Sequence, residues 1–224
     1  MTGAVPGLVI FDCDGVLVDS EPIAATVMAT AVSELGLPMT AADCLRRFTG
    51  IAMAKVIAAI EADLGRPLPE DFVARVRERD FAAFRQSLQP IAGVAAVAST
   101  LTVPKCVASS GAPEKIRFTL GLTGLLPLFA PHLFSAHMVR HGKPAPDLFL
   151  FAARAMHVAA DACAVVEDSE AGIRAARAAG MRALGFVGGS HCGTDHARLL
   201  RAAGAHAVLS QMADLPELLT ACAN

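Results

Sequence analysis

Short apolar runs alternate with longer amphipathic stretches along most of the chain. The first run, Leu8–Phe11, is continuous and ends at an acidic residue, as expected for a central strand that is covered on both faces. Further strands are predicted at Lys105–Ala108, His132–Ser135, Ala162–Val166, Arg182–Val187 and Ala207–Leu209. Helices are predicted between and after them at Pro113–Leu122, Pro146–His157, Ser169–Ala179, Asp195–Ala203 and Leu215–Ala221. This alternation predicts the α/β fold class, with a Rossmann-like parallel sheet core and helices on both faces.

The alternation is interrupted after the first strand, because no convincing strand follows until Lys105. In this interval, apolar residues recur at helical spacing from Ile23 to Leu35, from Val56 to Leu64 and from Phe72 to Leu88. The sequence therefore predicts an all-helical cap domain, residues 18–86, inserted into a catalytic core domain made of residues 1–17 and 87–224. A domain that is joined by two connections can hinge over whatever lies at the strand ends.

Composition narrows the class of protein. With 54% hydrophobic and 18% charged residues in a chain of 224, the sequence is typical of a globular protein. The 19 Lys and Arg residues form no basic stretch and aromatic residues make up 5%, so we expect no nucleic acid partner. The mean hydropathy is +0.50. No apolar run approaches the roughly 20 residues of a spanning helix, so we expect no membrane segment.

The sequence favours a cytoplasmic, bacterial protein. Its first apolar stretch has no basic leader and runs directly into Asp12 and Asp14, unlike a secretory signal. The excess of Arg over Lys beside many Ala residues is typical of a GC-rich bacterial genome. No CxxC pair occurs among the cysteines, which is typical of buried thiols in a reducing compartment. The six cysteines are Cys13, Cys44, Cys106, Cys163, Cys192 and Cys222.

Polar clusters lie at the ends of predicted strands or shortly beyond them, where open α/β sheets bind their ligands. The clusters are Asp12-Cys13-Asp14-Gly15, Ser109-Ser110-Gly111, Lys143-Pro144 and Glu167-Asp168-Ser169. If these segments converge, the four carboxylates lie close together and repel one another unless cations compensate their charge. Lys143 alone cannot balance them, whereas Mg²⁺ with a substrate phosphate can. The sequence therefore predicts a magnesium site that takes a small phosphorylated substrate.

The remaining groups suit phosphoryl transfer. Ser109 offers a hydroxyl, and the backbone N–H groups of Ser110 and Gly111 stand at the start of a predicted helix, where anionic oxygens bind. Lys143 adds a point charge that stabilises the transferring group. Asp12 directly ends its strand and is the candidate nucleophile. Asp14, two residues further on, is the candidate general acid and then general base.

At these residues the sequence resembles the haloacid dehalogenase superfamily of aspartate-nucleophile phosphohydrolases. FDCDGVLVDSE is similar to its first motif DxDGxxxDS, VASSG to its Ser/Thr motif, GKPAPD to its lysine motif and VVEDSEAGI to its acidic fourth motif. The resemblance covers nearly the whole chain and is closest to the β-phosphoglucomutase-like branch, which has a helical cap of the C1 type. It implies an aspartyl-phosphate intermediate on Asp12, with Asp14 as acid/base. The implied Mg²⁺ ligands are Asp12, Asp14 through its backbone, Glu167 and Asp168, and the implied phosphate contacts are Ser109 and Lys143.

The cap departs from the mutase type at two polar positions. Ala24 aligns with a histidine of the first cap helix, and Met53 aligns approximately with an arginine of a cap loop. Neither side chain can hydrogen-bond a sugar phosphate, which favours simple hydrolysis, although Lys55, Arg75 or Arg79 could take that role. The leading hypothesis is a Mg²⁺-dependent phosphatase acting on a sugar phosphate or a phosphorylated sugar acid. The alternatives are a β-phosphoglucomutase-like phosphomutase and a catalytically silent protein that binds phosphorylated metabolites.

Plainer structural interpretations exist for each cluster, since Asp and Ser are also common in turns and at helix N-termini. The occurrence of all the clusters in order favours the catalytic interpretation. His191, Cys192 and His196 in the segment GGSHCGTDH form a loose metal-like group. A closed zinc site would need a fourth ligand and tight spacing, so a loop that begins a helix is the simpler interpretation of this segment.

Overall fold

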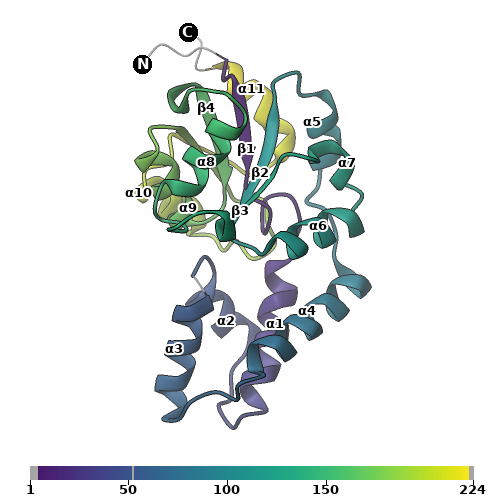
Figure 1. The fold of residues 1–224 in the computed structure, drawn as a ribbon, viewed down its shortest axis with the longest axis vertical. Helices are drawn as coiled ribbons and strands as arrows, with labels where there is room; N and C mark the ends of the chain where they lie inside the picture. Colours follow the sequence, from purple (N-terminus) through teal and green to yellow (C-terminus); the bar gives the residue numbers. More distant parts are fainter. Residues whose placement is uncertain (1–4, 52, 222–224) are drawn as a thin grey trace. The chain divides into compact units, whose positions relative to one another are not determined.

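The computed structural model describes residues 5–51 and 53–221, and Cys222 lies outside this range. The described residues form a six-stranded parallel sheet of order β3-β2-β1-β4-β5-β6 (Figure 1). The strands are β1 (Leu8–Phe11), β2 (Lys105–Ser109), β3 (Leu133–Ser135), β4 (Cys163–Glu167), β5 (Arg182–Phe186) and β6 (Ala207–Leu209). This sheet confirms the predicted α/β fold class with a Rossmann-like core.

Helices cover the sheet from both sides (Figure 1). On one side lie α8 (Asp147–Ala155), α9 (Glu170–Ala178) and α10 (His196–Ala202). On the other side lie α5 (Val94–Thr100), α6 (Pro113–Leu122), α7 (Leu126–Phe129) and α11 (Leu215–Ala221). Short 3₁₀ turns complete the chain at η1 (Ala136–Met138), η2 (Ala160–Ala162) and η3 (Met212–Asp214).

The central strand β1 shows why its sequence is apolar at every position. Leu8 and Ile10 belong to a buried cluster that also contains Leu148 of α8. Successive side chains of a strand point to opposite faces, so Phe11 faces the other layer. There its ring meets the ring of Phe129 edge to face, with the centroids 5.6 Å apart. Both faces of β1 are therefore packed, and its end is held firmly in the middle of the sheet.

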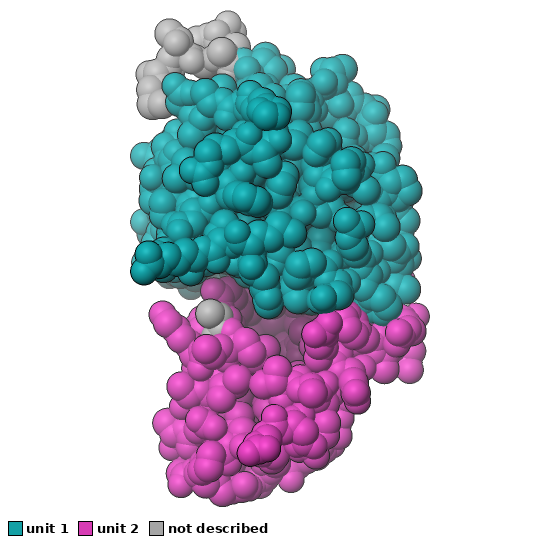
Figure 2. Space-filling model, viewed as in Figure 1, with its two compact units in different colours: residues 1–19, 90–224 teal, residues 20–89 magenta. Residues whose placement is uncertain are grey.

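The chain divides into two compact units (Figure 2). One unit is Met1–Asp19 with Pro90–Asn224 and contains the sheet, and the other is Ser20–Gln89. The second unit consists of α1 (Glu21–Ser33), α2 (Ala41–Phe48), α3 (Met53–Leu64) and α4 (Phe72–Ser87). Its own buried cluster includes Val32, Cys44, Ile60 and Val76, one from each of these helices. This unit therefore has a hydrophobic core that is separate from the core of the sheet.

The sequence pattern does not predict the helices α2, α5 and α7. The strands and helices that it does predict in the sheet-containing unit differ from the observed ones by at most one or two residues at either end. The start of α2 carries a signal that the periodicity does not show. Thr40 accepts a hydrogen bond from the Asp43 N–H at 3.1 Å, and Asp43 accepts one from the Thr40 N–H at 3.0 Å. Among the described residues, no helix is both long and apolar enough to cross a membrane.

Candidate active site

Three acidic side chains meet at the carboxyl ends of β1 and β4. These strands are neighbours, with Phe11 opposite Val166, and the Asp12 N–H donates to the Val166 carbonyl at 3.0 Å. The pairing places Asp12 beside Glu167 and Asp168, and all three side chains are buried. One carboxylate oxygen from each lies within 4.8 Å of the others. The acids that the sequence places at two different strand ends therefore share one site.

Lys143 joins this acidic group. Its Nζ donates to Asp12 Oδ1 at 2.8 Å and to Glu167 Oε1 at 2.6 Å, and its side chain is 4% exposed. Burial alone would lower the pKa of Lys143, but the two carboxylates outweigh it and raise the pKa above its usual value. The ammonium group therefore stays charged and bridges the ends of β1 and β4.

The surroundings of Asp12 disfavour its ionised form. Burial raises its pKa from the usual 3.8 to about 7, because Lys143 only partly offsets the desolvation and the charges of Glu167 and Asp14 add to it. A carboxylate in this position is poorly compensated by the protein alone. A further positive charge near Asp12 would favour its ionised form.

Asp14 lies apart from the three-acid group and has its own cation. Its Oδ2 accepts a hydrogen bond from Lys115 Nζ, on the first turn of α6, at 2.9 Å. The sequence predicts all four carboxylates in one cluster, whereas Asp14 is paired with Lys115, which no sequence motif singles out. The sequence signal for this contact is the position of Lys115 in the first turn of the helix that follows β2, close to the end of that strand.

The Ser109 segment lies beside Asp14 but differs in detail from the expectation. Ser109 ends β2, is 1% exposed and accepts the Gly111 N–H on its Oγ at 3.1 Å. The α6 helix begins only at Pro113, so Ser110 and Gly111 precede its first turn. A Cβ on Gly111 would lie 3.6 Å from Asp14 Oδ2. The segment 109–111 therefore lies close to Asp14, and the Gly111 N–H donates to Ser109 Oγ within the segment.

Two glycines let the backbone approach the acidic side chains. A Cβ on Gly172, in α9, would lie 1.8 Å from Glu167 Oε1. A Cβ on Gly15 would lie 2.0 Å from Asp168 Oδ2, and the φ of Gly15 is +76°. Any larger residue at either position would collide with a carboxylate of the site. Glu167 is also held by the Ser169 N–H, which donates to Oε2 at 2.7 Å.

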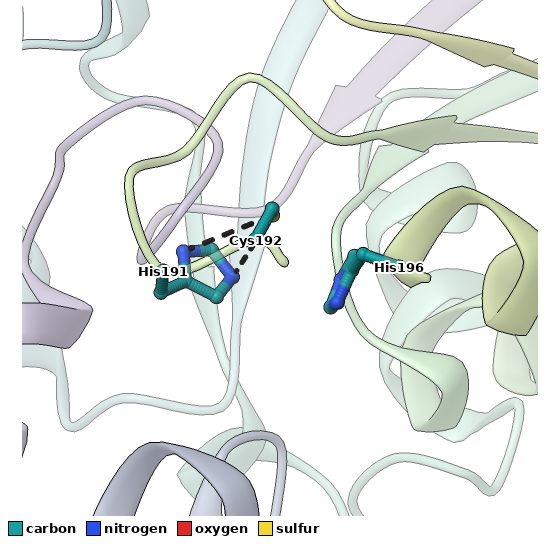
Figure 3. A group of neighbouring side chains, drawn as sticks. All are labelled: His191, Cys192 and His196. Atoms are coloured by element: carbon teal, nitrogen blue, oxygen red, sulfur yellow. Dashed lines mark hydrogen bonds between the residues drawn. The ribbon is translucent and has the colours of Figure 1, made fainter. Parts of the chain in front are cut away.

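Asp168 is held by a loop that sequence reasoning does not assign to this site. His191 Nε2 lies 2.9 Å from Asp168 Oδ2, and His196 Nε2 lies 2.5 Å from the Asp168 carbonyl oxygen. Figure 3 shows these two histidines together with Cys192. Because a carboxylate and a carbonyl oxygen can only accept, both imidazoles donate from Nε2. The side chain of Asp168 is therefore fixed by His191, in the loop 187–195 between β5 and α10, and its backbone carbonyl by His196, the first residue of α10.

The acidic group fits a hard divalent cation. Mg²⁺ binds oxygen ligands at about 2.0–2.1 Å, so two ligands on opposite sides of the ion are about 4.2 Å apart. The oxygens of Asp12, Glu167 and Asp168 lie within 4.8 Å of one another, close to this spacing. Burial, together with the neighbouring carboxylates, raises the pKa of Asp12, so a further positive charge beside it would favour its ionised form. A small dication with oxygen preference satisfies both conditions.

Comparison with known proteins identifies the family. Residues 6–180 match the haloacid dehalogenase-like hydrolases. The chain is 34% identical over 184 residues to the 6-phosphogluconate phosphatase of Escherichia coli (strain K12), which covers 82% of this chain and 83% of that protein. It is 32% identical over 180 residues to the fructose-1-phosphate phosphatase of the same organism, which covers 78% of this chain and 93% of that protein.

Solved structures agree with this match. A haloacid dehalogenase-like protein of unknown function from Agrobacterium tumefaciens has a TM-score of 0.87 at 40% identity, covering 97% of this chain and 99% of that chain. A haloacid dehalogenase family hydrolase from Deinococcus radiodurans, solved with bound phosphate and sodium, has a TM-score of 0.81 at 32% identity, covering 98% and 97%.

The chain belongs to the haloacid dehalogenase-like hydrolase family. This confirms the resemblance seen in the sequence motifs and the prediction that the chain is an enzyme. The phosphatase names of its relatives agree with the predicted class, phosphoric monoester hydrolase.

Proposed function

We propose that this protein is a Mg²⁺-dependent phosphatase that hydrolyses a small phosphorylated metabolite through an aspartyl-phosphate intermediate. The observation that supports this most directly is the buried group of Asp12, Lys143, Glu167 and Asp168 at the ends of adjacent strands. The cytoplasmic location stays a prediction from the sequence.

Asp12 is the proposed nucleophile. One of its oxygens is held by Lys143 at 2.8 Å, which orients the carboxylate and favours its ionised form. Attack on phosphorus forms an Asp12 oxygen–phosphorus bond and breaks the bond between phosphorus and the leaving oxygen. Water then attacks the phosphorus, releases inorganic phosphate and restores the carboxylate. The Lys143 ammonium stays beside Asp12 during both steps and offsets negative charge.

Asp14 is the proposed acid and base. Lys115 at 2.9 Å favours the ionised form of Asp14, and this form accepts a proton from the attacking water. The proton that Asp14 gains in this step is the one that it donates to the leaving oxygen in the next turnover. Ser109, near Asp14, is the proposed contact for the phosphoryl oxygens, together with the segment Ser110-Gly111.

The proposed ligands of Mg²⁺ are the side chains of Asp12, Glu167 and Asp168 and the backbone carbonyl of Asp14. When bound, the ion supplies the positive charge that the phosphoryl and carboxylate oxygens require. Lys143 already donates to Glu167 and to Asp12, so it fixes the spacing of two of these ligands.

The proposed substrates are sugar phosphates and phosphorylated sugar acids. The names of the 6-phosphogluconate and fructose-1-phosphate phosphatases support this class for the chain. We further propose that the helical domain, residues 18–86, acts as a cap that selects the substrate. The apolar side chains of Ala24 and Met53 favour hydrolysis over a mutase reaction, because a mutase must bind a second phosphate.

The test is a phosphate-release screen over phosphorylated sugars, sugar acids, glycolate and nucleotides, with and without Mg²⁺. We expect release only with Mg²⁺, and most rapidly from the sugar and sugar acid esters. Asp12→Asn should lower turnover by about four orders of magnitude or more, because the nucleophile is lost. Asp14→Asn should lower it by about 10²–10⁴-fold while phosphate binding is largely retained.

Asp161→Asn is the matched control, because Asp161 is an exposed aspartate in η2. It should release phosphate at the wild-type rate. Turnover by Asp12→Asn close to wild type would contradict the proposed nucleophile. Conversion of a hexose 1-phosphate to its 6-phosphate isomer without phosphate release would show that the protein is a phosphomutase and not a phosphatase. Saturable binding of sugar phosphates with no release at all would indicate a silent binding protein.

A further inference from the structure

The chain forms a tight turn directly after β1. The Gly15 N–H donates to the Val18 carbonyl at 2.8 Å, and the Val18 N–H donates to the Cys13 carbonyl at 3.1 Å. These two bonds close the turn over residues 13–18. Asp19 follows the turn and is the last residue of the sheet-containing unit before the helical unit begins. The closed turn therefore holds Asp19 at a defined place relative to the end of β1.

The Asp19 carboxylate holds the loop between β5 and α10, residues 187–195. Its Oδ1 accepts the Ser190 N–H at 3.1 Å, and its Oδ2 accepts the Ser190 hydroxyl at 2.6 Å. Hydrogen bonds to a carboxylate are roughly twice as strong as those between neutral groups. Because both donors belong to one residue, the two bonds fix the direction of the loop as well as its distance from the turn. The next residue of this loop is His191.

The ring of His191 packs against the turn and against its own loop. A Cβ on Gly15 would lie 2.8 Å from His191 Cε1, and a Cβ on Gly189 would lie 2.7 Å from the same atom. The His191 side chain is 2% exposed, and its Nε2 lies 2.9 Å from Asp168 Oδ2. The ring therefore has little room to rotate, and its contact with Asp168 depends on where the loop places it.

Two connections join the ends of β1 and β4. Lys143 is the direct one, since it donates to a carboxylate at each end. The second runs from the turn after β1 through Asp19, Ser190 and His191 to Asp168. We propose that Asp19 and Ser190 are positioning residues that hold His191 against Asp168 and so prepare Asp168 to bind Mg²⁺. This inference rests on the proposed function, which takes Asp168 as a Mg²⁺ ligand.

Asp19→Ala removes both acceptors of the Ser190 hydrogen bonds. It should weaken Mg²⁺ binding by about threefold to tenfold, less than the usual cost of removing a direct partner of a metal ligand. Asp19→Asn should keep the affinity within about twofold of wild type, because its amide oxygen accepts the Ser190 N–H and its amide NH₂ donates to the hydroxyl. Isothermal titration calorimetry of the metal-free protein with Mg²⁺ measures these affinities without turnover. Equal losses in the two variants would show that Asp19 acts through its charge and would overturn the proposal.

Asp43→Ala is the matched control. Asp43 Oδ2 accepts the Thr40 N–H at 3.0 Å and the Thr40 hydroxyl at 2.6 Å, the same pair of donor groups that Asp19 binds. Asp43 lies in α2 of the helical unit, so its loss should lower stability and leave the Mg²⁺ affinity unchanged. Equal weakening by Asp43→Ala and Asp19→Ala would overturn the proposal, because Mg²⁺ affinity would then follow stability alone.

A double variant tests whether Asp19 acts through His191. In the His191→Ala background, Asp19→Ala should weaken Mg²⁺ binding by less than about 1.5-fold, because the group that Asp19 positions is already absent. The same factor in both backgrounds would mean that Asp19 acts by another route, which would also overturn the proposal.

A second measurement needs no metal. In the metal-free protein with ¹⁵N-labelled histidine, the Nε2 proton of His191 should exchange slowly with solvent, because the ring is buried and donates to Asp168. Asp19→Ala should speed this exchange by about tenfold or more, whereas Asp19→Asn and Asp43→Ala should not change it. Equal exchange in wild type and Asp19→Ala would overturn the proposal. A wild-type protein that binds no Mg²⁺ would contradict the proposed metal site, and the exchange rates would still decide whether Asp19 positions His191.

Discussion

The orientation of Asp168 depends on His191 and His196, which follow helix α9 and strand β5 in the chain. The carboxylate accepts a hydrogen bond from His191, whose side chain is 2% exposed, and the backbone carbonyl accepts one from His196. Neither histidine belongs to the proposed phosphoryl-transfer group. Their effect is to limit the orientations of a carboxylate that is proposed to bind Mg²⁺.

His191→Ala should therefore weaken Mg²⁺ binding by about 10- to 100-fold, the usual cost of removing a hydrogen-bond partner of a metal ligand. Isothermal titration calorimetry of the metal-free protein measures this affinity without using turnover. His137→Ala is the control, because His137 is exposed and should leave the affinity unchanged. Equal Mg²⁺ affinities for wild type and His191→Ala would show that Asp168 needs no support from the loop.

The sequence is sufficient to place Asp12, Lys143 and Glu167 in one site, because each stands at or near a predicted strand end. The sequence does not reveal which other side chains contact the acidic residues of the site. Lys115 lies in the first turn of α6, and its contact with Asp14 depends on how that helix leaves the sheet. The contact of His191 with Asp168 depends on the path of the 187–195 loop, which no local pattern specifies.

Helix α9 contains a glycine, Gly172, that makes room for the side chain of Glu167, and this role can be tested separately from the effect of glycine on helix stability. Gly172 follows the acidic segment by one turn, and a Cβ there would lie 1.8 Å from the buried Glu167 Oε1. Ala normally stabilises a helix by about 1 kcal/mol relative to Gly. Gly172→Ala should instead lower the free energy of unfolding by about 1–3 kcal/mol, because Glu167 must leave its pocket or the helix must shift.

Gly121→Ala is the matched control. Gly121 lies inside α6, and a Cβ there meets nothing within 4 Å, so the change should stabilise the protein by about 0.5–1 kcal/mol. Urea denaturation of both variants provides the comparison. An equal increase in the free energy of unfolding for both variants would mean that Glu167 can move away from the new methyl group without loss of stability.

Helix α2 depends on its first residues more than on its buried face, which consists of Cys44. Thr40→Ala removes the side chain that accepts the Asp43 N–H at 3.1 Å. We expect a loss of about 1 kcal/mol in the free energy of unfolding, measured by urea denaturation. Thr30→Ala, the same change at an exposed position inside α1, should cost less than about 0.5 kcal/mol. A smaller effect for Thr40 than for Thr30 would contradict the importance of this N-cap.

The elements that the sequence predicts best are those with clear end signals. Helix α6 begins at a proline and β1 is a continuous apolar run, and both have the predicted bounds. The missed helices are short, and α7 is only four residues long. Helices of this length are stabilised mainly by tertiary packing, so their own sequence carries little periodic signal.

The order of the strands explains why residues distant in the chain form one site. Strands β2 and β3 lie on one side of β1, and β4, β5 and β6 lie on the other, so the chain reverses direction across the sheet at β1. Ligands of open α/β sheets bind at this point, beyond the carboxyl ends of the strands. The consequence is electrostatic, because burial raises the pKa of Asp12 from 3.8 to about 7.

This shift predicts how metal and pH act on the stability of the whole protein. The folded state holds a proton on Asp12 that the unfolded state releases above about pH 4, so stability is lost as the pH rises through about 7. Mg²⁺ beside Asp12 favours the ionised form and removes this loss. We therefore expect Mg²⁺ to raise the Tm more at about pH 8 than at about pH 5.5, as measured by calorimetry. Asp12→Asn should abolish the difference between the two pH values. An equal rise at the two pH values would show that Asp12 is already ionised in the metal-free protein at about pH 5.5.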